Sequence, residues 1–292
     1  MNLGITGATG FVGKVLIQAA IRRGFEVIAF TRDPSKPVGG CVETRRFSLD
    51  GVPDFSGCEA IVHLAGESVS GLWTAAKKSR IRESRVLGAQ RVVQGIRAAK
   101  EPPEVVVAAS AIGFYGNRGE TQLDEQSPRG AGFLADVCAD TEAEIASAEP
   151  LCRVVRARIA LVLGEGGALG AMRPIFKLGL GGPLGDGQQW MSWIHVEDAA
   201  ALLLFAVLNL DVHGALNVAA PWPVRNVDFT KQFARSLRRP ALIRVPAFAM
   251  RLVLREFADE LLGARRVVPA VATEHGFGFQ FPELTEAVFA NR

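Results

Sequence analysis

The 292-residue sequence predicts an α/β protein with a doubly wound parallel sheet and a smaller C-terminal lobe. Up to about residue 164, short apolar strands alternate with amphipathic helices, which is the pattern of a parallel sheet covered on both faces. Beyond that point, glycine- and proline-rich stretches such as GLGGPLGDG and APWPV break the rhythm. Apolar residues make up 49% of the chain, enough for a sizeable core.

The first elements follow one another closely. NLGIT (2–6) is a strand, GATGFVG (7–13) a turn, and VGKVLIQAAIRRG a helix with apolar positions 12, 15, 16 and 19 that stops at Gly24. FEVIAFT (25–31) is the second strand. Further strands are predicted over 59–65, 104–110 and 152–163, and helices over about 73–99 and 131–148.

Two regions of different character divide the chain. We predict a dinucleotide-binding domain over 1–164, with 190–220 returning to its sheet as strand, helix and strand. The lobe comprises 165–189 and 221–292, and closes over the strand ends.

Charge and cysteine usage exclude several function classes. There are 33 Lys and Arg against 30 Asp and Glu, which argues against a nucleic-acid partner. Four cysteines without a C-x-x-C pair or a histidine cluster argue against a metal site and fit reduced thiols. The longest apolar run, AALLLFAVLNL, is too short to span a bilayer. With no signal peptide expected, the sequence predicts a cytoplasmic protein with no membrane partner.

The turn at 7–13 has the pattern G-x-x-G-x-x-G between a strand and a helix. Glycines there permit a tight turn and close approach to a pyrophosphate, and the helix N-terminus supplies free N–H groups. The strand–helix–strand context makes a Rossmann-type cofactor site a stronger interpretation than a purely structural turn. The candidate cofactor-binding residues are Gly7, Thr9, Gly10, Phe11, Val12 and Gly13.

The residue after the second strand indicates which cofactor is bound. NAD sites usually have a carboxylate here for the ribose hydroxyls, whereas this chain has Arg32. A guanidinium can pair with a 2′-phosphate, so we predict NADP(H) rather than NAD(H). Asp33 could restore NAD binding, although alternation along an extended chain would point it away from Arg32. A solvated surface arginine is the other interpretation of Arg32.

Other strand ends should line the same crevice. Asp50 could hydrogen-bond the adenine amine, and Ser110 ends the fifth strand. The small residues of HLAGE would let the backbone of Leu64, Ala65, Gly66 and Glu67 lie against the cofactor.

Together these pieces resemble the extended short-chain dehydrogenase/reductase superfamily, which includes NAD-dependent epimerases and dehydratases. Longer stretches are similar to an atypical branch, the epimerase-family proteins with a C-terminal domain of unknown function. They are HLAGESV, SRIRESRVLGAQRVV, SAIGFYG, GLGGPLGDGQQWMSWIHVEDAA, LNVAAPWPVRN and GARRVVPAVATEHGFGFQFPEL. The resemblance covers nearly the whole chain and implies a Rossmann-type fold with a substrate lobe, NADP(H) binding and no assigned substrate.

The superfamily implies a catalytic serine and a Tyr-x-x-x-Lys pair on the next helix. The tyrosine moves a proton, and the lysine one turn away lowers its pKa. Ser110 stands at the serine position, but Phe133 and Val137 stand where the resemblance places the tyrosine and the lysine. The chain's only tyrosine, Tyr115, is followed four residues later by Gly119, so we expect it to shape the pocket wall, with a stand-in acid as the alternative.

Four further residues or groups are candidates with plain structural alternatives. The resemblance suggests that Ser84 and Arg85 line the cofactor site. Arg158 could reach the nicotinamide or pair with a carboxylate. Trp190 and Trp193 could stack on a flat ligand or pack in the lobe. His195 could act as a general base, although we favour a structural role.

The sequence thus predicts an NADP(H)-dependent oxidoreductase or epimerase-like enzyme with non-standard acid–base residues and a small-molecule substrate. A non-catalytic NADPH sensor or scaffold is the alternative, favoured by Phe133 and Val137. Members of the superfamily often dimerise, so a homodimer is compatible with the sequence.

Overall fold

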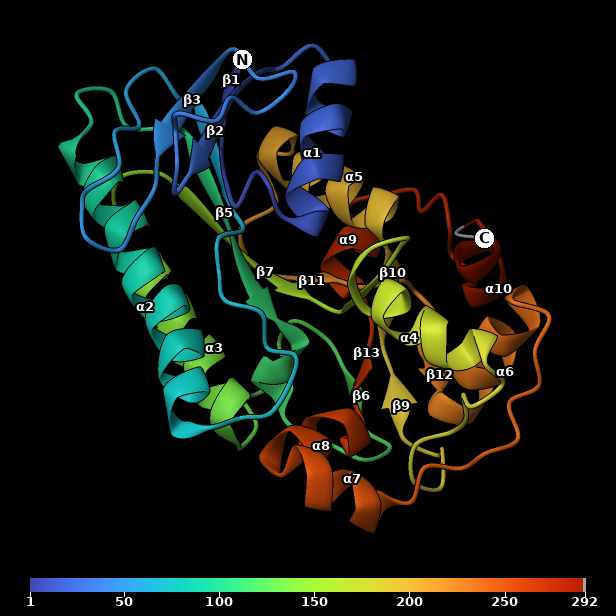
Figure 1. Cartoon of the computed structure of the whole chain (residues 1–292). Coiled ribbons are helices and arrows are strands. Elements are labelled where there is room, and N and C mark those ends of the chain that lie inside the picture. The colour runs from blue at the N-terminus through green and yellow to red at the C-terminus, as the bar shows by residue number, and fades with distance from the viewer. Residues whose placement is uncertain (291–292) are drawn as a thin grey trace.

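The computed structural model describes residues 1–290, which are built around a seven-stranded sheet (Figure 1). All neighbouring strands run parallel. In spatial order the strands are β11 (Gly214–Val218), β7 (Arg153–Ile159), β5 (Val105–Ala111), β4 (Ala60–His63), β1 (Asn2–Thr6), β2 (Glu26–Thr31) and β3 (Glu43–Arg46). This confirms the predicted α/β class.

The strand order reverses its direction of growth at β1. From β1 the chain proceeds to β2 and β3 on one side, then crosses to β4 on the other side and continues outward. Thr6 is in register with Phe30 on β2 and with His63 on β4, so three strands end close together. In a doubly wound sheet, a crevice opens beyond the carboxyl ends at such a reversal.

Helices cover both faces of the sheet (Figure 1). On one face α1 (Phe11–Arg22) packs beside α5 (Val196–Leu208) over a core that includes Leu3, Ile5, Leu16 and Leu203. On the other face α2 (Ala75–Ala98) packs beside α3 (Phe133–Ala146). Ile61, Val92, Val106 and Ile145 are among the residues of that second core.

Two predicted elements differ from the structure. The apolar run 152–163 predicts a single strand, but β7 ends at Ile159 and β8 (Leu161–Leu163) pairs with β10 (Trp193–His195) instead. Ala160 donates to Val218 on β11, whereas Leu161 donates to Ser192, so the chain leaves the main sheet between these two residues. Both halves are apolar, which hides the break in the sequence pattern. Of the segment 190–220, which was expected to return to the sheet as strand, helix and strand, only β11 joins the seven-stranded sheet.

The C-terminal lobe combines short helices with small sheets. It has its own apolar core, including Trp193, Phe229, Phe233 and Leu284. The helices are α4 (Gly167–Lys177), α6 (Asn226–Ser236), α7 (Ala247–Leu254), α8 (Glu256–Leu262), α9 (Ala270–Glu274) and α10 (Leu284–Phe289). The strand pairs besides β8–β10 are β9 (Trp190–Met191) with β12 (Val224–Arg225) and β6 (Gln122–Leu123) with β13 (Arg266–Val267). The division of the chain at residue 164 stays a prediction.

Candidate functional site

The glycine-rich loop forms a tight turn at the carboxyl end of β1. Gly7 has φ +69°, a conformation that side chains rarely adopt, and Gly10 donates to the Gly7 carbonyl at 2.9 Å. A Cβ on Gly13 would lie 2.3 Å from the Gly7 oxygen, so α1 can approach the loop this closely only with glycine there. The spacing of the glycines therefore has a steric cause.

The first turn of α1 is suited to an anion. Its N-cap, Gly10, offers no side-chain hydrogen bond to the first N–H groups, and no acidic residue stands in that turn. The ring of Phe11 lies against the backbone of Gly164, Gly166 and Gly167, where added Cβ atoms would come within 3 Å. The Phe11 ring is therefore a packing group, and only the backbone of Phe11 is left for a ligand at the loop.

Thr6 and His63 join the ends of β1 and β4. The Thr6 hydroxyl lies 2.7 Å from His63 Nδ1 and also accepts from the backbone N–H groups of Leu64 and Ala65. Burial, with a smaller effect of the Arg85 charge, lowers the pKa of His63 to about 4. The Thr6 hydroxyl thus ties the backbone of Leu64 and Ala65 to the end of β1, and His63 is hydrogen-bonded to the same hydroxyl.

Residues of α2 hold the next part of this segment. The Glu67 N–H donates to Ser84 Oγ at 2.9 Å, and Arg85 Nη1 donates to the Glu67 carbonyl at 2.8 Å. Lys77 donates to the Glu67 carboxylate at 2.7 Å and is the main cause of its lowered pKa, to which Arg80 and Arg32 contribute less. The structure thus brings Ser84 and Arg85 to the segment that follows β4, and their contact with a cofactor stays a prediction.

Arg32 and Asp33 follow β2 and differ in their surroundings. Both side chains are exposed. Asp33 accepts hydrogen bonds from the backbone and hydroxyl of Ser35 and pairs with Lys36 at 3.0 Å. The Ser35 hydroxyl is the main cause of the lowered pKa of Asp33. The Asp33 carboxylate is therefore engaged in its own turn. Asp50, in the turn after β3, is exposed as well.

Ser110 near the end of β5 is hydrogen-bonded to a carboxylate that sequence reasoning missed. Its hydroxyl donates to Glu142 Oε1 on α3 at 2.7 Å. Ser110 is half-buried, whereas Glu142 is only 4% exposed. Glu142 lies four residues after buried Cys138 on the same helix face. A carboxylate on an otherwise apolar helix stripe needs a buried partner, and that was the available signal.

Phe133 and Val137, at the helix positions expected for a tyrosine and a lysine, serve in packing. Val137 is fully buried. The Phe133 ring packs on Trp73 with centroids 5.1 Å apart, and Lys78 Nζ lies 4.7 Å from the Phe133 centroid. Lys78 also pairs with Glu256 at the start of α8, so the lobe contacts the beginning of α2 here.

Tyr115 lies in the core, which corrects the expectation that it shapes the pocket wall. It is fully buried, and its hydroxyl donates to Asn217 Oδ1 at 2.7 Å. The same oxygen accepts from Arg158 Nη1 at 2.9 Å. Burial raises the pKa of Tyr115 to about 12. A phenol with both hydrogen-bonding roles filled and no exposure is not positioned to exchange a proton with a ligand.

The sequence left open whether Arg158 reaches the nicotinamide or pairs with a carboxylate. In the structure it forms a buried ion pair with Glu142. It binds Glu142 with two hydrogen bonds of 2.8 and 2.9 Å, and both side chains are 6% exposed. Its Nη1 also donates to Tyr115 and to the Glu125 carbonyl. Four of its five donors are thus engaged within the protein, and its guanidinium stacks 3.6 Å from the Phe114 centroid.

The remaining candidates separate into core and surface. Trp193 is fully buried and donates to the Trp222 carbonyl, whereas Trp190 lies between the guanidinium groups of Arg225 and Arg266, 4.0 and 4.7 Å away. His195 is 3% exposed and its Nδ1 accepts from the first turn of α5. Its place fits the structural role that we favoured.

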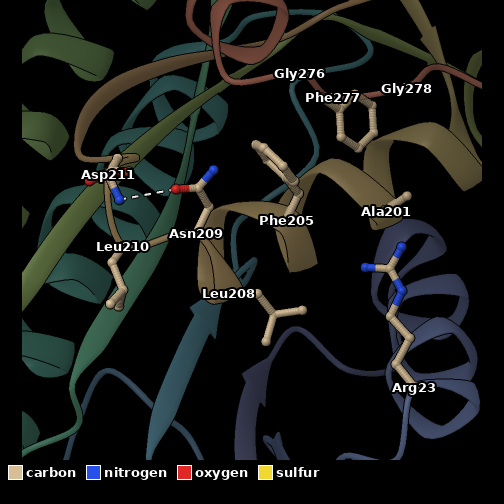
Figure 2. A pocket seen from close by; sticks show the side chains of 10 residues that line it. All are labelled: Arg23, Ala201, Phe205, Leu208, Asn209, Leu210, Asp211, Gly276, Phe277 and Gly278. Atoms are coloured by element: carbon tan, nitrogen blue, oxygen red, sulfur yellow. Dashed lines mark hydrogen bonds between the residues drawn. The ribbon is translucent and has the colours of Figure 1, made fainter.

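A pocket of about 660 Å³ lies at the amino-terminal end of the strands, away from the glycine loop (Figure 2). Arg23 and Asn209, which line it, follow the C-terminal ends of α1 and α5, where β2 and β11 begin. It therefore forms no part of the crevice at the glycine loop. The lining residues are Arg23, Ala201, Phe205, Leu208, Asn209, Leu210, Asp211, Gly276, Phe277 and Gly278. Among residues 1–290, no group of three or more His, Cys, Asp or Glu is arranged to hold a metal ion.

Comparison with protein-family profiles shows the family to which the chain belongs. The profile of the NAD dependent epimerase/dehydratase family matches residues 3–219, which include the whole seven-stranded sheet except Asn2. The chain belongs to this family. A second profile, a domain of unknown function called DUF1731, matches residues 245–289 in the lobe.

Individual relatives place the chain in one branch of the family. An epimerase family protein SDR39U1 homologue of Arabidopsis thaliana, described as chloroplastic, is 37% identical over 99% of this chain and 86% of the relative. Human epimerase family protein SDR39U1 is 33% identical over 99% of this chain and 98% of the relative. The recognised resemblance is thereby confirmed.

Solved structures extend the likeness to three dimensions. The crystal structure of the human protein with NADPH superposes with a TM-score of 0.91 at 33% identity, covering 100% of this chain and 99% of that one. A nucleoside-diphosphate sugar epimerase of Corynebacterium glutamicum gives 0.81 at 31% identity, covering 100% of this chain and 58% of that one.

Proposed function

We propose that this protein binds NADP(H) in the crevice beyond β1, β2 and β4. The observation that carries the proposal is the first turn of α1, which has no side-chain cap and no acidic residue. It directly follows the glycine loop, where Gly13 lets the helix lie close to the Gly7 carbonyl. Such a turn leaves N–H groups and a positive dipole end for a pyrophosphate. The NADPH in the structure of the human relative supports the same cofactor here.

Arg32 would select the phosphorylated cofactor. It is exposed beyond β2, and Asp33 is occupied by Ser35 and Lys36, so the local carboxylate does not compete with a 2′-phosphate for the guanidinium. Asp50 would meet the adenine. The other proposed cofactor residues are Gly7, Thr9, Gly10, Phe11, Val12, Gly13, Leu64, Ala65, Gly66, Glu67, Ser84 and Arg85.

As the first functional candidate, we infer an oxidoreductase or epimerase-like enzyme acting on a small molecule between the sheet and the lobe. The cofactor would supply hydride transfer, and the protein would bind and orient the reactants. Ser110 would contact the substrate. Because the Ser110 hydroxyl donates to Glu142, its oxygen can accept a hydrogen bond from a ligand hydroxyl. Arg158 would act by holding Glu142.

A non-catalytic NADPH sensor or scaffold is the second candidate. It is favoured by phenylalanine and valine at positions 133 and 137 and by the burial of Tyr115, which together leave no tyrosine–lysine pair on α3. Consumption of NADPH with a panel of aldehydes, ketones and nucleotide sugars distinguishes the two. Turnover that Ser110→Ala abolishes supports the enzyme, whereas tight NADPH binding without turnover supports the sensor.

Arg32→Ala tests the cofactor assignment. We expect the Kd for NADPH to rise roughly thirtyfold, corresponding to about 2 kcal/mol for a charge-assisted pair, with little change for NADH. Arg22→Ala, an exposed arginine at the other end of α1, is the matched control. Equal weakening of both nucleotides by Arg32→Ala would remove the assignment.

Two further predictions concern the protein in the cell. A cytoplasmic location is proposed because the four cysteines are free thiols. None of the helices within residues 1–290 is long and apolar enough to cross a membrane. A homodimer stays a prediction.

A further inference from the structure

One segment of the lobe is both apolar and basic. Residues 229–255 contain no Asp or Glu. Large apolar side chains stand in water along this segment, with exposed fractions of 83% for Leu242, 74% for Phe248 and 80% for Leu252. We call the α7 surface the exposed apolar residues Leu242, Ile243, Phe248, Leu252 and Val253 together with the exposed arginines Arg235, Arg238, Arg239, Arg244, Arg251 and Arg255.

Helix α7 shows that this exposure is patterned. Its one buried residue is Met250, which packs toward the protein. Phe248, Arg251 and Leu252 follow the spacing i, i+3 and i+4, so they share the opposite face, and Arg255 caps the C-terminal end of the helix. Basic helices that expose aromatic and aliphatic side chains are typical of membrane surfaces.

The apolar area extends beyond α7. Val245 donates to Pro183 and accepts from Gly185, which ties the 180–185 loop to this segment. The chain leading into that loop also exposes apolar side chains, with Leu178 at 74% and Leu180 at 53%. Isolated exposed leucines are ordinary on soluble proteins, but several on adjoining segments mark an interaction site.

The positive charge of this surface is largely uncompensated. Within residues 1–290, only one of its six arginines forms an ion pair. Arg251 pairs with Asp259, and both of these side chains are more than half exposed. A two-fold contact with a second copy would bring these guanidinium groups against their own counterparts, which is repulsive. The occupant must therefore carry negative charge as well as apolar groups.

We propose that the α7 surface docks the protein on an anionic lipid bilayer. Figure 1 shows α7 at the outer edge of the molecule, with α8 between it and β6. A helix at the outer edge can meet a broad planar surface such as a bilayer. The apolar side chains would enter the headgroup boundary, and the arginines would pair with lipid phosphates. The sequence predicted no membrane partner, because that prediction considered only spanning segments.

Vesicle co-sedimentation of the full chain tests the proposal. The protein should sediment with phosphatidylcholine vesicles that contain about one third phosphatidylglycerol, and much less with phosphatidylcholine alone. Raising the salt concentration should release it, since screening shortens the reach of the charges.

Two variants separate the contributions. Arg238→Gln/Arg244→Gln should lower the partition coefficient roughly 25-fold, from about fivefold for each arginine near an anionic surface. Phe248→Ser/Leu252→Ser should lower it on the order of tenfold or more. Arg22→Gln and Leu210→Ser, exposed on other elements, are the matched controls. All four proteins should keep the wild-type Tm, because the replaced side chains are exposed.

Three results would overturn the proposal. The first is equal binding to neutral and anionic vesicles. The second is a loss of binding no greater in the α7 variants than in the controls. The third is binding of the α7 surface to an acidic amphipathic peptide, or dimerisation that Phe248→Ser/Leu252→Ser abolishes, without vesicle binding. None of these measurements depends on NADP(H), so their outcome leaves the proposed function untouched.

Discussion

Replacing Tyr115 by phenylalanine tests whether the chain's only tyrosine is structural. The substitution removes a hydroxyl that donates to Asn217 and accepts from Arg158, both of them buried. The ring keeps its place beside Phe114 and within the small core that includes Leu123. The change is therefore confined to two hydrogen bonds.

The expected cost follows from the groups left behind. Asn217 Oδ1 loses the donor that Tyr115 supplied, and a buried acceptor without a partner costs about 1–3 kcal/mol. Arg158 Nη1 keeps a 3.2 Å bond to the Glu125 carbonyl and so loses less. Together we expect the free energy of unfolding to fall by about 3 kcal/mol, which lowers the Tm by roughly 6–10 °C.

Urea and thermal unfolding of Tyr115→Phe measure this loss, and calorimetry measures NADPH affinity, which should not change. Asn217→Ala and the double variant complete a cycle, in which the two losses should be strongly non-additive because they share a bond. If Tyr115→Phe kept wild-type stability but abolished turnover, Tyr115 would be an acid and the structural assignment would fail.

Two further substitutions test how the crevice is held. The pKa of His63 is lowered from its ordinary 6.5 to about 4 by burial, so the unfolded chain takes up its proton first as the pH falls. Wild-type stability should therefore drop by about 3 kcal/mol between pH 6.5 and 4, and this drop should be missing in His63→Gln; parallel urea-unfolding profiles would contradict it. Gly13→Ala places a Cβ 2.3 Å from the Gly7 oxygen, so both stability and NADPH affinity should fall, whereas Gly39→Ala, which meets nothing within 4 Å, should be neutral. Wild-type NADPH binding by Gly13→Ala would show that the loop does not need the close contact.

Much of the fold was predictable because its signals are local. The glycine pattern at 7–13 and the stop at Gly24 follow from backbone geometry, and the structure has α1 between them with Gly24 at φ +81°. Apolar strands alternating with helices predicted a parallel sheet, which the structure has. The absence of a tyrosine–lysine pair at 133 and 137 is likewise a matter of residue identity alone.

The rest depends on contacts between distant segments. Ser110, Glu142 and Arg158 lie on three different elements, and no periodicity connects them. The sequence left open whether Arg158 met a carboxylate or the cofactor, and only the packing of α3 on β7 decides where its donors go. Similarly, the burial of Tyr115 depends on Asn217, which is 102 residues away on β11.

The central claim is that an uncapped helix start behind a close-packed glycine loop binds a phosphorylated nicotinamide nucleotide. Titration calorimetry of the wild-type chain with NADPH and with NADH tests it most directly. We predict a saturable one-to-one heat with NADPH and binding of NADH that is weaker by roughly tenfold or more. A titration in which neither nucleotide produces heat of binding would contradict the account.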